Sequence, residues 1–222
     1  MLLLALDTAT PAVTVALHDG DKVVAESRQV DARRHGELLL PAVDRVLAEA
    51  GRKLDAVTDI VVGVGPGPYT GLRVGIVTAA TFGAALSVPV RGLCSLDGIA
   101  YAAGQQGLEG EFVVATDARR KEVYWARYAD ARTRLTEPAV DRPAELTEPL
   151  AGLTVIGAGA LLYRDAFTDV RDDMPEHQSA GALASLAVEK LRTGGEFLPD
   201  QPLYLRRPDA QVPANYKVVT PK

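Results

Sequence analysis

The chain has 222 residues, 47% of them hydrophobic, and a formal net charge of −5 at pH 7. This composition supports a sizeable core and argues against disorder, and the acidic balance argues against a general nucleic-acid-binding protein, which would carry a basic footprint. The single cysteine, Cys94, excludes an internal disulfide and favours a reducing, cytoplasmic location. The apolar start reaches only to Asp7, and no run approaches the ~20 apolar residues of a membrane span, so we expect no membrane association.

Strand and helix patterns alternate along the first hundred residues. Apolar runs or strict alternation predict strands over residues 2–6, 13–17, 22–30, 60–64 and 88–93. Apolar residues at helical spacing predict helices over residues 36–50, 71–86 and 95–103. This alternation is typical of an α/β fold.

A glycine-rich turn, residues 65–71, separates the fourth strand from the second helix. Gly65 and Gly67 permit unusual backbone conformations, and Thr70 is placed to cap the helix that follows. A turn of this kind that opens a helix can cradle an anion on its free amides. It can equally be a tight crossover without a ligand, and the pattern alone leaves both interpretations open.

The helix after this turn has a face of small residues at every fourth position: Gly71, Gly75, Ala79 and Gly83. Residues spaced by four stack on one side of a helix, so another backbone can approach closely there. The neighbour is either the chain's own sheet, its own first helix, or a second protein. Packing within the chain is the commoner outcome, and the two explanations can coexist.

The second half of the chain repeats the beginning. The segment 113–118 resembles 3–8, and 123–126 resembles 13–16 at the same offset, 117 − 7 = 110, without a gap. A repeated supersecondary unit predicts two related lobes. We divide them at the polar, glycine-containing segment 104–110, which gives an N-terminal lobe over 1–103 and a smaller C-terminal lobe with an extended tail over 104–222.

Candidate ligand-binding residues gather where the first strand of each lobe ends. Asp7 and Asp117 stand where α/β sheets bind ligands, and basic residues follow Asp117. The candidate phosphate or nucleotide cleft comprises Asp7, Thr8, Gly65, Gly67, Asp117, Arg119 and Arg120. The competing interpretation is that each aspartate closes an Asx-turn and that the basic residues are solvated.

The sequence offers no convincing catalytic centre. None of the histidines, His18, His35 and His177, is spaced for a metal site, and no G-x-S-x-G nucleophile elbow occurs. Cys94 has no histidine near it in the sequence, which favours a buried structural thiol. We therefore predict no catalytic residue, no metal ligand and no cofactor, and leave open whether nucleotide binds weakly.

The string from Gly65 to Gly75, GPGPYTGLRVG, resembles the signature of the bacterial TsaB (YeaZ) family, whose usual form is close to GPGSFTGLRIG. Residues 6–9, 35–41, 117–124 and 202–206 resemble further landmarks of that family, so the resemblance extends over about residues 1–210. Pro68 and Tyr69 are mild departures from the signature, and Lys121 stands where a glycine is common.

The resemblance implies two ribonuclease-H-like lobes of the actin, sugar-kinase and Hsp70 superfamily. It also implies a role in forming N6-threonylcarbamoyladenosine at position 37 of tRNAs that read codons starting with adenine. TsaB proteins pair with TsaD, a paralogue that carries the transfer chemistry on a metal held by an H-x-x-x-H motif, and the ATPase TsaE completes the set. The predicted helix 95–103 has no histidine, which fits a partner without that site.

On this basis we expect a non-catalytic heterodimer partner of TsaD that meets tRNA through the complex and self-associates through the same surface when alone. The predicted docking helices are 36–50 and 71–86, with contact residues Leu39, Val43, Val46, Gly71, Gly75, Ala79 and Gly83. The alternatives are an ATP-dependent phosphotransferase of the same superfamily or, with less support, a peptidase.

Overall fold

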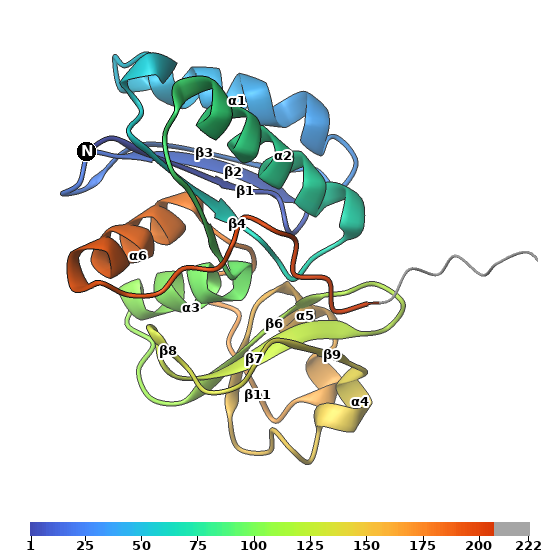
Figure 1. Ribbon diagram of the computed structural model, residues 1–222. Coiled ribbons are helices and arrows are strands. Elements are labelled where there is room, and N and C mark those ends of the chain that lie inside the picture. The colour runs from blue at the N-terminus through green and yellow to red at the C-terminus, as the bar shows by residue number, and fades with distance from the viewer. Residues whose placement is uncertain (207–222) are drawn as a thin grey trace, which may run out of the picture.

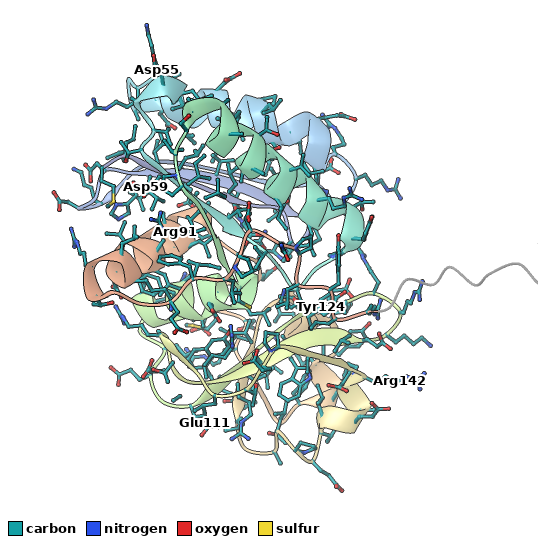
Figure 2. The ribbon with its side chains drawn as sticks, in the orientation of Figure 1. Asp55, Asp59, Arg91, Glu111, Tyr124 and Arg142 are labelled. Carbon is teal, nitrogen blue, oxygen red and sulfur yellow. The ribbon has the colours of Figure 1, made fainter. Side chains whose placement is uncertain are left out.

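The computed structural model describes residues 1–206; the predicted extended tail beyond them, residues 207–222, lies outside the described part. Two β-sheets lie one above the other in Figure 1, each with helices packed on it. Side chains fill the space between these layers (Figure 2).

The first sheet has the strand order β3-β2-β1-β4-β5. Its central strand β1 (Leu3–Asp7) pairs antiparallel with β2 (Ala12–His18) and parallel with β4 (Asp59–Gly63). The outer strands are β3 (Val23–Val30) and β5 (Val90–Leu93). All five strands fall where the sequence predicts them, with ends that differ by up to two residues.

The second sheet has the order β11-β10-β6-β7-β8, with β9 also paired to β7. Its strands are β6 (Phe112–Asp117), β7 (Val123–Asp130), β8 (Thr133–Arg134), β9 (Ala139–Asp141), β10 (Thr154–Ile156) and β11 (Asp169–Val170). The strand β6 pairs antiparallel with β7 and parallel with β10, as β1 does with β2 and β4. The two sheets therefore share one topology, which confirms the repeat and the predicted fold class.

The pairing corrects one detail of the repeat. Ala5 faces Ala16 across the first sheet, and Ala115 faces Trp125 across the second. The offset is thus 115 − 5 = 110 for the first strand of each pair but 125 − 16 = 109 for the second. The ungapped match is wrong by one residue in the second strand because Asp7 pairs with Thr14, seven residues on, whereas Asp117 pairs with Val123, six residues on.

Three helices belong to each repeat, but their lengths differ strongly. The first repeat has α1 (His35–Glu49), α2 (Tyr69–Leu86) and α3 (Ser95–Gln105), with a 3-10 turn at Leu54–Ala56. The second has α4 (Pro143–Leu146), α5 (Ala158–Leu162) and α6 (Ala180–Thr193), with a 3-10 turn at Arg164–Ala166. Only the first sheet therefore carries two long helices, α1 and α2, on its outer face.

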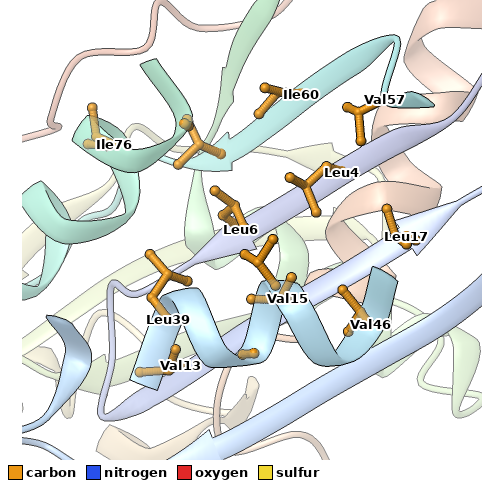
Figure 3. Packing of buried hydrophobic residues seen from close by; sticks show 14 of the residues in the cluster. Leu4, Leu6, Val13, Val15, Leu17, Leu39, Val46, Val57, Ile60 and Ile76 are labelled. Carbon is orange, nitrogen blue, oxygen red and sulfur yellow. The ribbon is translucent and has the colours of Figure 1, made fainter. Parts of the chain in front are cut away.

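The largest core cluster lies between these two helices and the first sheet (Figure 3). Leu39 and Val46 point from α1 toward β1 and β2, and Ile76 of α2 lies over the same face. The apolar residues of β1 alternate sides: Leu4 and Leu6 face this cluster, whereas Leu3 and Ala5 face the other side of the sheet. A sheet covered on both faces explains the continuous apolar run at the start of the chain.

The last helix of each repeat packs against the sheet of the other repeat. Leu183 and Ala187 of α6 pack with Leu3 and Ala16 of the first sheet. Ile99 of α3 shares a cluster with Phe112 and Tyr128 of the second sheet. The two helices also contact each other (Figure 1), and the chain passes from one sheet to the other as it enters each of them. The predicted division of the lobes between residues 103 and 104 stays a prediction. Because α3 and α6 each pack on the sheet of the other repeat, both helices connect the two lobes.

Candidate functional site

The glycine-rich turn is buried and filled by the chain itself. Gly65 has a φ of +100°, and a Cβ atom on it would lie 2.9 Å from the Leu72 side chain. A Cβ atom on Gly67 would lie 2.2 Å from the carbonyl oxygen of Ala9, closer than atoms can approach. The helix begins after Pro68 without a side-chain cap, so the cap predicted at Thr70 is wrong. These contacts favour the tight crossover over an open anion cradle.

Thr8 binds the first turns of α2 and explains two of the glycines. Its hydroxyl donates to the Gly71 carbonyl oxygen at 2.7 Å and accepts from the Gly75 amide at 3.0 Å. A Cβ atom on Gly75 would lie 2.6 Å from that hydroxyl oxygen, and one on Gly71 would lie 2.7 Å from the Thr8 carbonyl oxygen. The loop after β1 can therefore lie directly on the helix backbone. Gly83 serves the same purpose further along, where a Cβ atom would lie 2.2 Å from Val90.

The predicted partner-contact residues are buried within the chain. Leu39, Val43, Val46 and Ala79 belong to the core cluster of the first sheet, and the glycines of the small-residue face contact the loop after β1 or strand β5. All seven are buried in this chain, and their direct contact with a partner stays a prediction. The physical reason for the burial is that the first sheet occupies the periodic face of both helices. Of the alternatives left open by the sequence, packing within the chain is the one observed.

The opposite side of α2 is exposed. Tyr69, Arg73, Val77 and Thr81 are also spaced by four, but they are offset by two positions from the buried small residues. Tyr69 is 56% exposed and Val77 is 55% exposed, and Arg73 is the one charged residue among the 18 of this helix. We call these four residues the outer stripe. On the neighbouring α1, Leu40 is 51% exposed.

The outer stripe is the feature that sequence reasoning missed. The signal was present, because an exposed helix side normally carries several charges and this one carries one. The small-residue face, which the sequence singles out, lies on the buried side of the same helix.

Asp7 is enclosed in the core of the first sheet. Its Oδ1 accepts a hydrogen bond from the Ala9 amide at 2.8 Å, the geometry of an Asx-turn. Its Oδ2 has no hydrogen-bond partner among the described residues and lies 1.8 Å from the place that a Cβ atom on Gly63 would take. Burial raises the pKa of Asp7 to about 6, against a smaller lowering by the Ala9 amide. This carboxyl group is not open to a ligand.

Asp117 lies at the edge of a small cavity between the lobes. Its Oδ1 accepts from the Arg119 amide at 2.7 Å, and its Oδ2 pairs with the Arg119 guanidinium at 3.3 Å. The cavity measures about 180 Å³ and is lined by Thr10, Thr116, Asp117 and His177 among others. Both aspartates thus close Asx-turns, as the competing interpretation predicts, and of the seven candidate cleft residues only Asp117 lines this cavity.

The turn after Asp117 has an uncommon backbone. Arg119, Arg120 and Lys121 have φ values of 62°, 55° and 64°, so three successive non-glycine residues are left-handed. All three side chains are exposed. Lys121 also lines a wider surface pocket of about 400 Å³ with Arg142 and Tyr163, at the outer edge of the second sheet (Figure 2).

Within residues 1–206, no group of three or more histidine, cysteine, aspartate or glutamate side chains is placed to hold a metal ion. No helix in this part of the chain is long and apolar enough to cross a membrane.

Comparisons with known proteins identify related sequences along most of the chain. The family described as TsaD, tRNA N6-adenosine threonylcarbamoyltransferase, matches residues 23–163. An uncharacterized protein of Mycobacterium tuberculosis is 44% identical over 211 residues, which cover 94% of this chain and 93% of that protein. The tRNA threonylcarbamoyladenosine biosynthesis protein TsaB of Haemophilus influenzae is 38% identical over 209 residues, which cover 92% of this chain and 83% of that protein.

A solved structure leads to the same result. YeaZ from Pseudomonas aeruginosa superposes with a TM-score of 0.79 at 31% identity, covering 92% of this chain and 99% of that one. The likeness thus extends over both lobes. The chain belongs to the TsaB (YeaZ) family.

Proposed function

We propose that this chain is the non-catalytic partner of a TsaD protein in the formation of threonylcarbamoyladenosine in tRNA. Membership of the TsaB family supports the pathway, since relatives in Escherichia coli, Haemophilus influenzae and Bacillus subtilis are named for it. In this assignment TsaD carries the transfer chemistry, and TsaE and tRNA join through the complex.

The outer side of α1 and α2 is the docking surface in this proposal, and the outer stripe is the observation that carries it. The family model of TsaD itself matches residues 23–163, which include both helices. Two chains with the same helices can pair about a pseudo-two-fold axis, each using the same surface. Such a pairing needs two exposed helix sides without many charges, and the outer stripe with Leu40 provides one of them. The same surface would allow self-association when TsaD is absent.

The geometry supports the phosphotransferase and peptidase alternatives less well. A phosphotransferase needs an accessible acidic group beside a phosphate-binding loop, but here Asp7 is buried and Ala9 fills the space over Gly67. A cysteine peptidase needs a reactive thiolate, but burial raises the pKa of the Cys94 thiol well above its usual value. Docking on α1 and α2 requires neither group.

The test introduces a negative charge into the outer stripe. Val77→Glu places a carboxylate at the middle of the stripe, where burial without a partner would cost several kcal/mol. We expect the variant to fold and to lose co-purification with TsaD and the support of threonylcarbamoyladenosine formation. The matched control is Leu162→Glu on α5, which is 58% exposed and lies in the second lobe. Retention of TsaD by Val77→Glu, at the level of the control, would refute the docking surface.

A further inference from the structure

The segment that follows α6, residues 197–206, crosses from the first sheet to the second along the front of the molecule (Figure 1, red). We call it the C-terminal strap. At its start, Phe197 lies 5.5 Å from the Arg91 guanidinium, which also pairs with Asp59 at 2.9 Å (Figure 2). The strap then joins the edge of the first sheet, because Leu198 and Gly92 exchange two backbone hydrogen bonds of 2.8 and 2.9 Å.

The sequence of the edge strand is adapted to this contact. A Cβ atom on Gly92 would lie 2.4 Å from the Pro199 carbonyl oxygen, so a side chain at this position would displace the strap. An edge strand offers unpaired backbone groups that need a cover. The strap provides that cover over part of β5.

The strap next reaches the start of α2. The Leu203 amide donates to the Val64 carbonyl oxygen at 2.8 Å, in the loop that follows β4. The Tyr204 ring then stacks on the Tyr69 ring with 5.2 Å between centroids and 22° between planes. The Arg73 guanidinium lies 5.2 Å from the same Tyr69 ring and donates to the Tyr69 hydroxyl.

The end of the strap is fixed to the second lobe. Arg206 pairs with Glu122 and donates to the Arg119 carbonyl oxygen at 3.3 Å, within the left-handed turn after β6. Tyr204 is therefore held between two anchored points, Leu203 on the first lobe and Arg206 on the second. Its side chain is nevertheless 46% exposed, beside Tyr69 at the end of the outer stripe.

From this arrangement we infer that Tyr204 extends the TsaD-docking surface, so that the strap contributes a contact residue to α2. The inference rests on the proposed function and names a further part of the same surface. Tyr69, Arg73 and Tyr204 form what we call the aromatic corner. Tyrosine and arginine are enriched among residues that dominate interface energies, and stacked rings lose little side-chain entropy on binding. Tyr69 belongs both to the aromatic corner and to the outer stripe, so the two form one continuous surface. TsaD, the proposed partner of the outer stripe, is therefore also the partner that we infer for the aromatic corner.

Tyr204→Ala tests this inference in the full-length protein. We expect the Kd for TsaD, measured by calorimetry, to rise roughly tenfold or more, the range of an interface hot spot. Tyr204→Phe keeps the stack on Tyr69 and should stay within about threefold of wild type, since it loses at most one neutral hydrogen bond. Leu135→Ala, at a side chain 50% exposed just after β8 in the second lobe, is the control and should bind as wild type.

A second measurement guards against a folding defect in the alanine variant. In the wild-type protein, hydrogen exchange at the Leu203 and Tyr204 amides should slow when TsaD is added. An unchanged Kd for Tyr204→Ala together with unchanged exchange at these amides would overturn the role of the strap. If Val77→Glu still abolishes binding in that case, the docking surface on α2 stands and only the strap is refuted. If Val77→Glu binds normally, the docking surface itself fails and the strap inference fails with it.

Discussion

The buried carboxyl group of Asp7 makes the stability of the fold depend on pH in a defined direction. Its pKa is raised from 3.8 in the unfolded chain to about 6 in the folded protein, chiefly by burial. The folded state therefore holds the proton more tightly than the unfolded state. The resulting contribution to stability is fully present below the unfolded pKa and is lost as the pH rises through about 6.

The magnitude follows from the shift. A difference of 6 − 3.8 = 2.2 pKa units, at ~1.36 kcal/mol per unit, corresponds to about 3 kcal/mol. Most of this, roughly 2.5 kcal/mol, is lost between about pH 4 and pH 7.5 because ionisation of the folded state is nearly complete at the upper limit. The full value applies because the carboxyl group has no exposed surface.

The substitution Asp7→Asn removes the titration and keeps an oxygen for the Ala9 amide. We expect the free energy of unfolding of the variant, relative to wild type, to increase by roughly 2.5 kcal/mol between about pH 4 and pH 7.5. Urea unfolding at several pH values measures this difference, and any fixed cost of the amide appears equally at every pH. Asp55→Asn, which replaces an exposed carboxylate (Figure 2), is the control substitution. A difference between Asp7→Asn and wild type that stays flat with pH would refute the reasoning.

Three further substitutions probe the backbone. Gly67→Ala should destabilise the protein by about 1–3 kcal/mol because its Cβ would overlap the Ala9 carbonyl oxygen, whereas Gly36→Ala, in α1 with nothing within 4 Å of its added Cβ, should stabilise it by ~0.5–1 kcal/mol. Urea unfolding of both variants checks this, and equal effects would show that the loop is not tightly packed. Lys121→Gly should raise the free energy of unfolding by about 1 kcal/mol, because a left-handed φ of 64° is unfavourable for lysine and not for glycine. An unchanged urea midpoint would mean that the turn is not strained at this residue.

The positions of the long elements could be predicted from the sequence. The helical spacing of apolar residues predicts α1, α2 and α3 within about two residues of their observed ends. The apolar runs predict the central strands of both sheets, and the repeat predicts that the sheets share a topology. These features are local or periodic, so each is encoded by residues close together in the chain.

The candidate site was predicted only in part, for physical reasons that involve distant residues. The sequence of α2 shows that one face is made of small residues, but it does not show which neighbour occupies that face. Thr8, 63 residues away from Gly71, decides this by inserting its hydroxyl against the helix. The same contact leaves the outer stripe on the opposite side, and Tyr204 reaches that stripe only because the strap crosses both lobes.

The sequence by itself determined the elements, the two-fold repeat and the resemblance to the TsaB family, because each depends on spacing or on a contiguous motif. The tertiary structure decided which side of α2 is exposed, how deeply Asp7 is buried and where the strap runs. Close packing requires each face to be matched against a surface from elsewhere in the chain, and no local pattern specifies that surface.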